Sequence, residues 1–321
     1  MPRMAKGYKS KLALGFEETY GVMPDSPKGY DMPFNSYGVS LTRSLNAAET
    51  ISGTRNPKEP FAGNTDVSGD IVVPVDLIAF GYWLRGLFGA PVTTPGEESA
   101  PNTHLFKIND DLESMWIQTY LATSPGNYVL TNGVKFSTMA IEAGGDGELT
   151  ATLSTMGSNQ TLGAESKAGE LTPVSFLRLN NFQASLKLDD VEYGDATAFS
   201  LNLDNGLDGD VYTIGSGGTR GDIVEGLGTV SGSMTVLFKD ADLVADALAG
   251  TKKSGELIFT RPEGSLSFGF QEFLLQAKTP EISGPAGIRL DMEWQAFFES
   301  GSNKSALTAT LVNTHPSYAD A

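Results

Sequence analysis

The sequence predicts a mainly β protein that contains two tandem copies of one unit, each with a single flanking helix. Two observations predict the duplication. Gly53-Thr54-Arg55 precedes Val67-Ser68-Gly69, and Gly218-Thr219-Arg220 precedes Val230-Ser231-Gly232 in the same order. The offset is 165 residues at the first motif (218 − 53) and 163 at the second (230 − 67), so the copies remain in register apart from small insertions.

Strands are expected on both sides of each repeated motif, because apolar and small polar residues alternate there. In the first copy these strands cover residues 37–44 and 67–75, and in the second copy 196–203 and 230–238. The second strand of each copy leads to an aspartate and then to a helical pattern. Asp76 precedes residues 77–89, and Asp240 precedes residues 241–250. Each helix is expected to pack on the sheet.

The remaining segments complete the predicted organisation. Glycine-rich turns predict hairpins within residues 141–153 and 281–292. Further strands are expected at 114–123, 128–141, 147–155, 179–188, 256–260, 265–276, 287–298 and 306–312. We interpret residues 1–36 as an N-terminal arm, 37–160 as the first unit, 161–175 as a linker and 176–321 as the second unit with a C-terminal strand and tail.

Length and composition limit the possible classes of protein. The 321 residues allow about two domains, and with no cysteine the chain forms no disulfide. No apolar run approaches the ~20 residues of a membrane span, and no secretory signal is visible, so we expect a soluble protein without a membrane partner. The formal charge of −17 argues against tight nucleic-acid binding, which depends on Lys and Arg. The simplest interpretation of this charge is a solvated acidic surface.

The residues give little support to an enzyme or a metal site. His104 and His315 lie in different halves and are expected at the surface, with no set of zinc ligands. Residues 204–215 start like a calcium loop but lack its final glutamate, so an acidic turn is expected. Neighbouring acids such as Asp110 and Asp111 are expected in solvated turns rather than as a glycosidase pair. We therefore expect no catalysis and no cofactor.

Two long loops stand out between paired strands. Residues 45–66 and 204–229 each connect neighbouring strands over more than twenty residues, which is unusual in a compact domain and more often functional than idle.

Several of these segments together resemble the tail tube proteins of long-tailed bacteriophages. They are residues 15–24 (GFEETYGVMP), the 40–43 strand, the Gly-Thr-Arg loop, residues 63–69 with the helix that follows, and residues 306–313. The resemblance covers most of the chain and depends on the order of its elements. It implies two tandem β-sandwich or partial-barrel domains, each with one flanking helix, and rings that stack into the conduit for the phage genome.

The resemblance also implies a place and partners. We expect a structural protein of the virion tail, assembled in the host cytoplasm, that meets tape measure, tail terminator and distal tail proteins and lets DNA pass without specific binding. Family members with a single domain form hexameric rings, so two domains per chain predict trimeric, pseudo-hexameric rings.

The strands suggest which residues line the channel and which connect rings. The candidates for the lumen lie on the small polar face of the paired strands, and the candidates between rings lie in the long loops. The lumen-facing candidates are Ser40, Thr42, Ser44, Ser68, Asp70, Glu148, Ser200, Asn202, Ser231, Ser233, Asp291 and Glu293. The inter-ring candidates are Gly53, Thr54, Arg55, Gly218, Thr219 and Arg220.

A second hypothesis is a non-enzymatic β-sandwich module that binds carbohydrate or decorates the virion like an adhesin. Such a module would expose a patch of aromatic side chains. Trp83, Trp116 and Trp294 instead fall on apolar faces of predicted elements.

Overall fold

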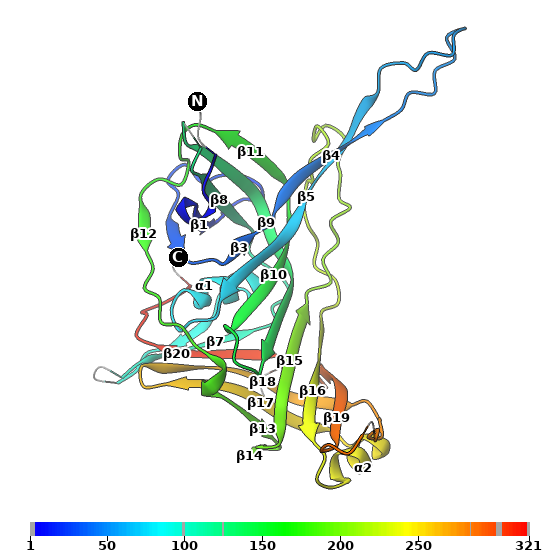
Figure 1. Ribbon diagram of the computed structural model, residues 1–321. Coiled ribbons are helices and arrows are strands. Elements are labelled where there is room, and N and C mark those ends of the chain that lie inside the picture. Colours follow the sequence, from blue (N-terminus) through cyan, green and yellow to red (C-terminus); the bar gives the residue numbers. More distant parts are fainter. Residues whose placement is uncertain (1–3, 98–99, 124, 283, 300–303, 320–321) are drawn as a thin grey trace.

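The computed structural model is mainly β, as predicted, with a large sheet that curves around a buried core (Figure 1). It describes residues 4–97, 100–123, 125–282, 284–299 and 304–319. Ser283, in the second predicted hairpin, lies outside these ranges. The helices α1 (Phe80–Phe88) and α2 (Asp242–Ala249) each follow a pair of antiparallel strands, one in each half of the chain.

Eight antiparallel strands form a continuous sheet to which both halves contribute four strands. The two halves join where β9 pairs with β15, from Thr138 opposite Asp204 to Ala143 opposite Phe199. Each half has the same strand order in space. The two strands that precede its helix come first, and the two paired strands that follow the helix come next, in the reverse of their sequence order. In spatial order the strands are β4 (Ser40–Asn46), β5 (Phe61–Pro74), β10 (Thr150–Gly157), β9 (Asn127–Ala143), β15 (Ala196–Asp204), β16 (Thr229–Leu237), β19 (Arg289–Phe297) and β18 (Gly264–Leu275).

A second layer covers the core from the other side. Its central strand is β20 (Thr308–Asn313), which pairs with β18 on one side and with β7 (Asn102–Lys107) of the first half on the other. The layer continues through β17 (Lys253–Arg261) and β13 (Ala184–Leu188) on the β18 side, and ends in β6 (Val92–Thr94) on the β7 side. The short β14 (Val191–Glu192) pairs with β13. The two layers give the chain its sandwich-like cross-section.

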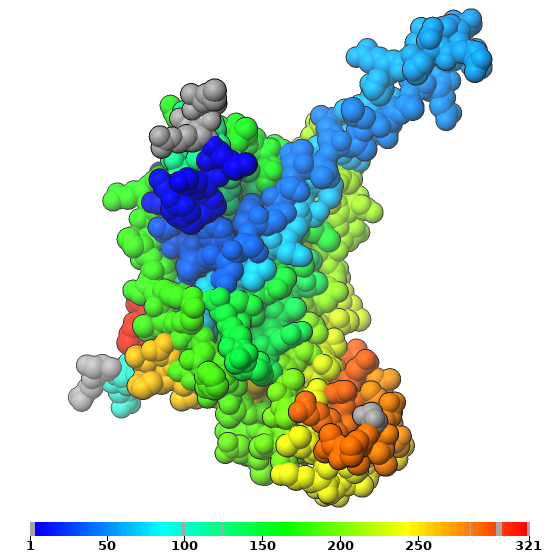
Figure 2. Space-filling model, in the orientation of Figure 1, coloured from blue at the N-terminus to red at the C-terminus, as the bar shows by residue number. Residues whose placement is uncertain are grey.

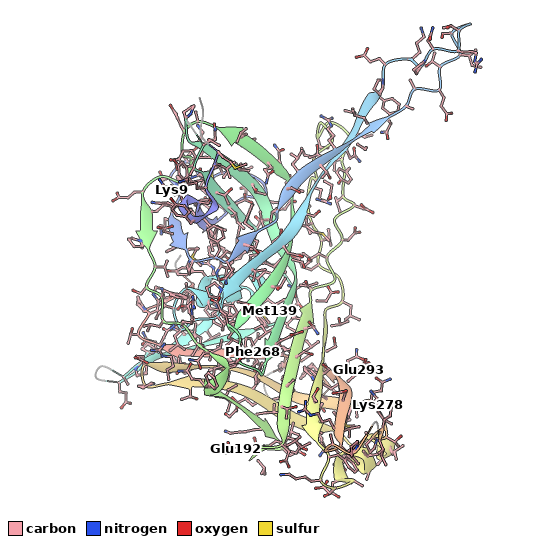
Figure 3. All side chains as sticks on the ribbon, viewed as in Figure 1. Lys9, Met139, Glu192, Phe268, Lys278 and Glu293 are labelled. Atoms are coloured by element: carbon pink, nitrogen blue, oxygen red, sulfur yellow. The ribbon has the colours of Figure 1, made fainter. Side chains whose placement is uncertain are left out.

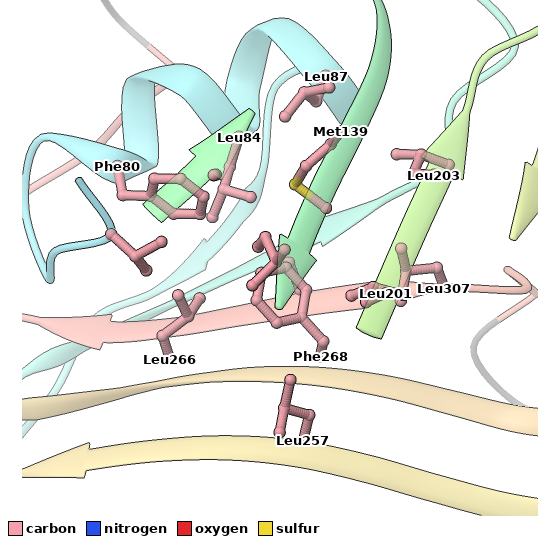
Figure 4. Packing of buried hydrophobic residues seen from close by; sticks show 14 of the residues in the cluster. Phe80, Leu84, Leu87, Met139, Leu201, Leu203, Leu257, Leu266, Phe268 and Leu307 are labelled. Atoms are coloured by element: carbon pink, nitrogen blue, oxygen red, sulfur yellow. The ribbon is translucent and has the colours of Figure 1, made fainter. Parts of the chain in front are cut away.

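The core lies between these layers and is shared by both halves (Figure 4). Phe80 and Leu84 of α1 point toward Met139 of β9, while Leu203 of β15 and Phe268 of β18 come from the second half. All five side chains are fully buried. Burial of this apolar surface is the main term that stabilises the fold, and it couples the halves because neither encloses the core alone.

Asp76 holds the turn before α1. Its carboxylate accepts backbone N–H bonds from Ile78 (2.7 Å), Ala79 (2.7 Å) and Phe80 (3.1 Å), as a capping residue does. The predicted helix therefore starts at Phe80 rather than at residue 77. In the second half Asp240 bonds the N–H of Asp242 at 3.1 Å. Burial raises the pKa of Asp76 to about 7, although its backbone bonds oppose that shift.

Residues 4–36 contain more structure than the predicted arm. β1 (Lys11–Phe16) lies between β2 (Gly29–Met32) and β8 (Met115–Leu121), and buries Leu12 and Leu14 completely. After β1, the Glu17 carboxylate accepts bonds from the N–H groups of Gly21 (2.8 Å) and Gly133 (2.9 Å) and the hydroxyl of Ser114 (2.8 Å). This carboxylate connects the start of the chain to the first half.

Short strands also occur in segments where no strand was expected. The segment around the predicted linker contains β11 (Asn159–Gly163), which pairs with β9, and β12 (Leu171–Pro173), which pairs with β2. β3 (Ser36–Tyr37), which pairs with β5, contains the first residue of the predicted strand 37–44 but is separate from β4, which begins at Ser40. The 3-10 turns η1 (Gly7–Lys9) and η2 (Asn181–Gln183) precede β1 and β13. Such short elements are stabilised by tertiary partners rather than by a period of their own.

The C-terminal segment closes the outer side of α1. The Tyr318 hydroxyl donates to the Ile78 carbonyl at 2.8 Å, and Arg85 Nη1 donates to the Tyr318 carbonyl at 2.7 Å. Gly81 faces the Tyr318 ring so closely that a Cβ there would lie 2.2 Å from it. Only glycine at this position lets the ring approach the helix.

Candidate functional site: the polar sheet face and the two loops

One face of the eight-stranded sheet is built from small polar and acidic side chains. Residues directly opposite each other in an antiparallel ladder point to the same face. Ser200 stands opposite Glu142 and Ser233, and Ser233 stands opposite Glu293. In the neighbouring row, Asn202 stands opposite Ala140 and Ser231, and Ser231 stands opposite Gln295. The row beyond joins Asp70, Ser154, Thr138 and Asp204.

The alternate residues point the other way, into the core. Ile71, Leu153, Met139, Leu203 and Val230 form one such row and are at most 1% exposed. The sheet is therefore amphipathic across the junction between the halves.

Carboxylates predominate on the polar face. Asp70, Glu142, Asp204 and Glu293 stand in the three rows described above, which contain no lysine or arginine. Outside these rows, Arg289 lies on the same face of β19 as Asp291, and Lys135 lies in the row of Ser68, where it is buried and paired with Glu225. Thr235 donates to Asp291 Oδ1 at 2.7 Å, and the hydroxyls of Ser200 and Ser233 are 2.9 Å apart. Figure 3 shows Glu293 on β19 at one end of this surface. Small side chains and carboxylates give it a polar and negative character.

Most sequence-predicted lumen candidates share this face. Ser40 is opposite Ser68 and Thr42 is opposite Asp66, which extends the face to β4. Ser44 lies at a bulge in the same strand pair. Glu148 is elsewhere: it precedes β10, pairs with Arg178 at 3.0 Å and accepts a bond from Asn35. The prediction missed Glu142 and Asp204, which the alternation along β9 and β15 could have identified.

A hollow of about 640 Å³ opens on the polar face of the second half. Ser200, Asn202, Ser231, Ser233 and Glu293 line it, together with Trp294 and Gln295. Trp294 is only 3% exposed, and Trp83 and Trp116 are fully buried. These tryptophans offer no exposed aromatic surface for a sugar.

The loop between β4 and β5 projects from the body as an arm, residues 47–60 (Figure 2). The pair Asn46 and Phe61 closes the strand ladder at its base. The tip carries Gly53, Thr54 and Arg55, all exposed. Ile51 is 98% exposed, which is unusual for a large aliphatic side chain.

The second loop, residues 205–228, packs against the first half of its own chain. The N–H of Thr65 in β5 donates to the Gly218 carbonyl at 2.7 Å, and the Tyr212 hydroxyl donates to the Thr65 carbonyl at 3.0 Å. Gly218 and Thr219 are half-buried there. Ile214 of this loop is fully exposed.

Arg220 fixes this second loop. Its guanidinium donates to the carbonyls of Gly209 (2.7 Å), Val67 (3.1 Å) and Gly157 (3.0 Å), and pairs with Asp66. Its side chain is 8% exposed. Burial opposes ionisation of Asp66, but the bonds from Arg220 and Ser68 outweigh it and lower the pKa of this carboxyl.

Lys135 of β9 provides a second connection to the loop. Its ammonium donates to the Ile223 carbonyl at 2.8 Å and pairs with Glu225 at 2.7 Å. Glu225 also accepts the N–H of Leu112 at 3.0 Å. The pKa of Glu225 is lowered because these bonds exceed the opposing effect of burial. The contacts of Arg220 and Lys135 together hold residues 205–228 on the first half.

The expectation of surface histidines was wrong for His104. Its ring is fully buried, with Nδ1 at 2.9 Å from the Thr93 hydroxyl and Nε2 at 3.1 Å from the Asn313 side chain and from the His315 carbonyl. Burial lowers its pKa. β7 and β20 bring these residues together, and no sequence pattern indicates that pairing. His315 is half-buried beside Tyr82.

Within the described ranges, no cluster of three or more His, Cys, Asp or Glu side chains is arranged to hold a metal ion. The described helices are all too short or too polar to cross a membrane.

A family model described as "phage tail tube protein" matches residues 7–296, which is most of the chain. No curated protein matches the sequence.

Proposed function

Because the chain belongs to the phage tail tube protein family, we propose that copies of it polymerise into stacked rings and that the polar sheet face lines the channel for phage DNA. The chain is a structural tail tube protein, a component of the virion tail. The observation that carries the channel proposal is the set of carboxylates in the three central rows of the polar face, which contain no lysine or arginine.

The charge distribution suits the passage of a polyanion. DNA binds proteins mainly through lysine and arginine, which displace the counterions of its phosphates. A wall of serine, threonine, asparagine and carboxylate side chains offers no such contact, and its potential repels the phosphates over about one Debye length. DNA can then move along the wall without being held.

The junction of β9 and β15 suggests how one copy joins the next. We propose that residues 37–160 and 176–321 are two related tube domains, supported by their common strand order. If so, the end of β18 should pair with β4 of a second copy, in the same way as the end of β9 pairs with β15 within one chain. Among the described strands, β4 pairs only with β5, and all its residues are exposed. An open strand edge of this kind favours pairing with another chain.

The strand registers identify the residues of the second half that would form the other side of this contact. Phe136 of β9 stands opposite Thr155 of β10, and Leu275 of β18 holds the corresponding position opposite Trp294 of β19. Residues 137–143, which follow Phe136 and pair with β15, correspond to residues 276–282. That segment is exposed and forms no strand in the single chain. In the ring it becomes an extension of β18.

Three copies complete the ring in this proposal. Each supplies two domains, so three chains give a pseudo-sixfold lumen whose symmetry is threefold, because the two domains differ in their loops. Tape measure, terminator and distal tail proteins are the partners expected at the tube ends, and assembly takes place in the host cytoplasm.

One exposed isoleucine in each loop is proposed to meet the next ring. Ile51 in the arm and Ile214 in the second loop are 163 residues apart, the same offset as the Val-Ser-Gly motifs. Two exposed isoleucines at corresponding positions form a pattern typical of a contact surface.

Electron cryomicroscopy of assembled protein tests the proposal. We expect tubes with three chains of 34.0 kDa per ring and the polar face toward the lumen. Six chains per ring with one half of each turned outward would contradict the ring architecture, and a lumen lined by another surface would contradict the assigned channel wall.

A further inference from the structure

The second loop shows how a loop of this type attaches to the neighbouring domain, and the arm has no such attachment to the described residues of its own chain. Building on the proposed ring, we propose that the arm binds the second half of the adjoining copy, with Arg55 occupying a hollow there as Arg220 occupies its site on the first half.

The two loops have nearly equal reach. Leu41 and Val67 are opposite each other at the base of the first loop, and Leu203 and Val230 are opposite each other at the base of the second. Leu41 and Val67 are 26 positions apart in the sequence, and Leu203 and Val230 are 27 positions apart. Arg55 and Arg220 end the same Gly-Thr-Arg motif, and its glycines, Gly53 and Gly218, share positive φ angles of 72° and 87°.

The surface beneath Arg220 can be located on the second half from the strand registers. Val67 stands opposite Gly157 where Arg220 binds their carbonyls, and the corresponding pair is Val230 opposite Ala296. The residues that precede each member of these pairs along the chain correspond in the same way. Asp66 corresponds to Thr229, and Met156, which Gly209 of the loop approaches, corresponds to Gln295.

These four corresponding residues line one hollow. Thr229, Val230, Gln295 and Ala296 all border a space of about 720 Å³, which Ile108, Asn109, Asp110 and Leu112 of the first half also line. The site that holds a loop on the first half therefore has an open counterpart on the second. Leu227, 91% exposed, stands at its border.

Acids outnumber cations in the lining of this hollow. Thr229 replaces the carboxylate of Asp66, but the exposed Asp110 lines the same hollow, as do Glu225, which pairs with Lys135, and the exposed Lys304. Arg55 is exposed in the arm and forms no hydrogen bond or ion pair with the described residues of its own chain. A guanidinium with five donors can bind both a carboxylate and backbone carbonyls, as Arg220 does. The adjoining copy is thus the partner that the arm requires.

The chain has no cysteine, so crosslinking can test the contact without background. Thr54→Cys and Leu227→Cys are made as separate variants, mixed, assembled and treated with a short bismaleimide. The matched internal control is Thr219→Cys with Asn64→Cys in one chain, at the corresponding positions. We expect the mixture to give a covalent dimer that neither single variant gives, and the control to give an internal link without a change in mass.

The outcomes separate this contact from the ring itself. If rings form and the mixture gives no 54–227 dimer, or if Thr54→Cys links instead to Thr251→Cys beside α2, the arm contact is wrong and the ring stands. If wild-type protein remains monomeric at every concentration, both proposals fall.

Substitution of the arginine gives an independent readout. Arg55→Ala should leave the unfolding midpoint of the monomer unchanged and raise the critical concentration for assembly at least about tenfold, as expected for loss of a charge-assisted contact. Assembly at the wild-type concentration would contradict a role for Arg55.

Discussion

Arg220 and Asp66 are 154 positions apart in the sequence and form an ion pair that attaches the second loop to the first strand pair of the sheet. The guanidinium also satisfies carbonyl groups of Val67 and Gly157 at the ends of two adjacent strands. One side chain thus connects the long loop of one half to the sheet of the other.

Removal of this side chain should destabilise the monomer. Asp66 is about half exposed, so the ion pair itself contributes little, and most of the loss comes from buried carbonyls left without a donor. We expect Arg220→Ala to lower the free energy of unfolding by about 2–3 kcal/mol in urea titrations. Arg55→Ala, at the corresponding exposed position, is the matched control and should have no effect. Equal effects of the two substitutions would contradict the assigned role of Arg220.

Asp76 should make stability depend on pH with an unusual sign. Its folded pKa of about 7 lies above the unfolded value of 3.8, so the folded state binds more protons between these values. The free energy of unfolding of the wild-type protein, relative to that of the Asp76→Asn variant, should therefore fall as pH rises from about 4 to about 7, by up to about 1.4 kcal/mol per pH unit. Thermal or urea unfolding of both proteins across this range measures the difference. A difference that grows with pH would show that the three backbone N–H bonds dominate over burial.

Shortening the arm should separate folding from assembly. Asn46 and Phe61 already form a pair at its base, so residues 47–60 can be replaced by Asn-Gly, a dipeptide suited to a two-residue hairpin turn. We expect an unchanged circular dichroism spectrum and melting temperature, but no tubes by negative-stain microscopy. Normal tubes from this variant would contradict an assembly role for the arm.

Reversing charge on the polar face should slow the passage of DNA and leave assembly of the tube unchanged. Asp70→Lys, Asp291→Lys and Glu293→Lys place cations on the proposed channel wall, where they attract phosphates most strongly at low salt. We expect tubes of normal length but slower genome ejection, measured by DNA release from purified phage. Glu165→Lys with Glu170→Lys, both exposed and outside the polar face, is the control. Ejection at the wild-type rate in low salt would show that this face does not line the channel.

Periodicity in the sequence was sufficient to predict the strands of the eight-stranded sheet. β9, β15 and β16 lie within one or two residues of the predicted ranges, because a sheet with one buried face imposes strict alternation. The same alternation placed Ser200, Asn202 and Ser233 on one surface.

Contacts between distant segments were beyond reach of this reasoning. β1, β7 and β12 are short and gain their stability from partners far away in the sequence. The two loops have similar lengths and share a motif, so nothing in their sequences distinguishes the arm, which projects, from the loop that Arg220 and Lys135 hold down. That difference depends on which domain lies beside each loop.

Tyr318 and β20 have a consequence for biosynthesis. β20 pairs with β7 of the first half, and the Tyr318 ring fills the space against Gly81 of α1. The first half therefore cannot finish its core while it emerges from the ribosome, since two of its contacts come from residues translated some two hundred positions later. A nascent chain should remain incomplete until translation has passed Tyr318, which delays the moment at which its strand edges can recruit other subunits.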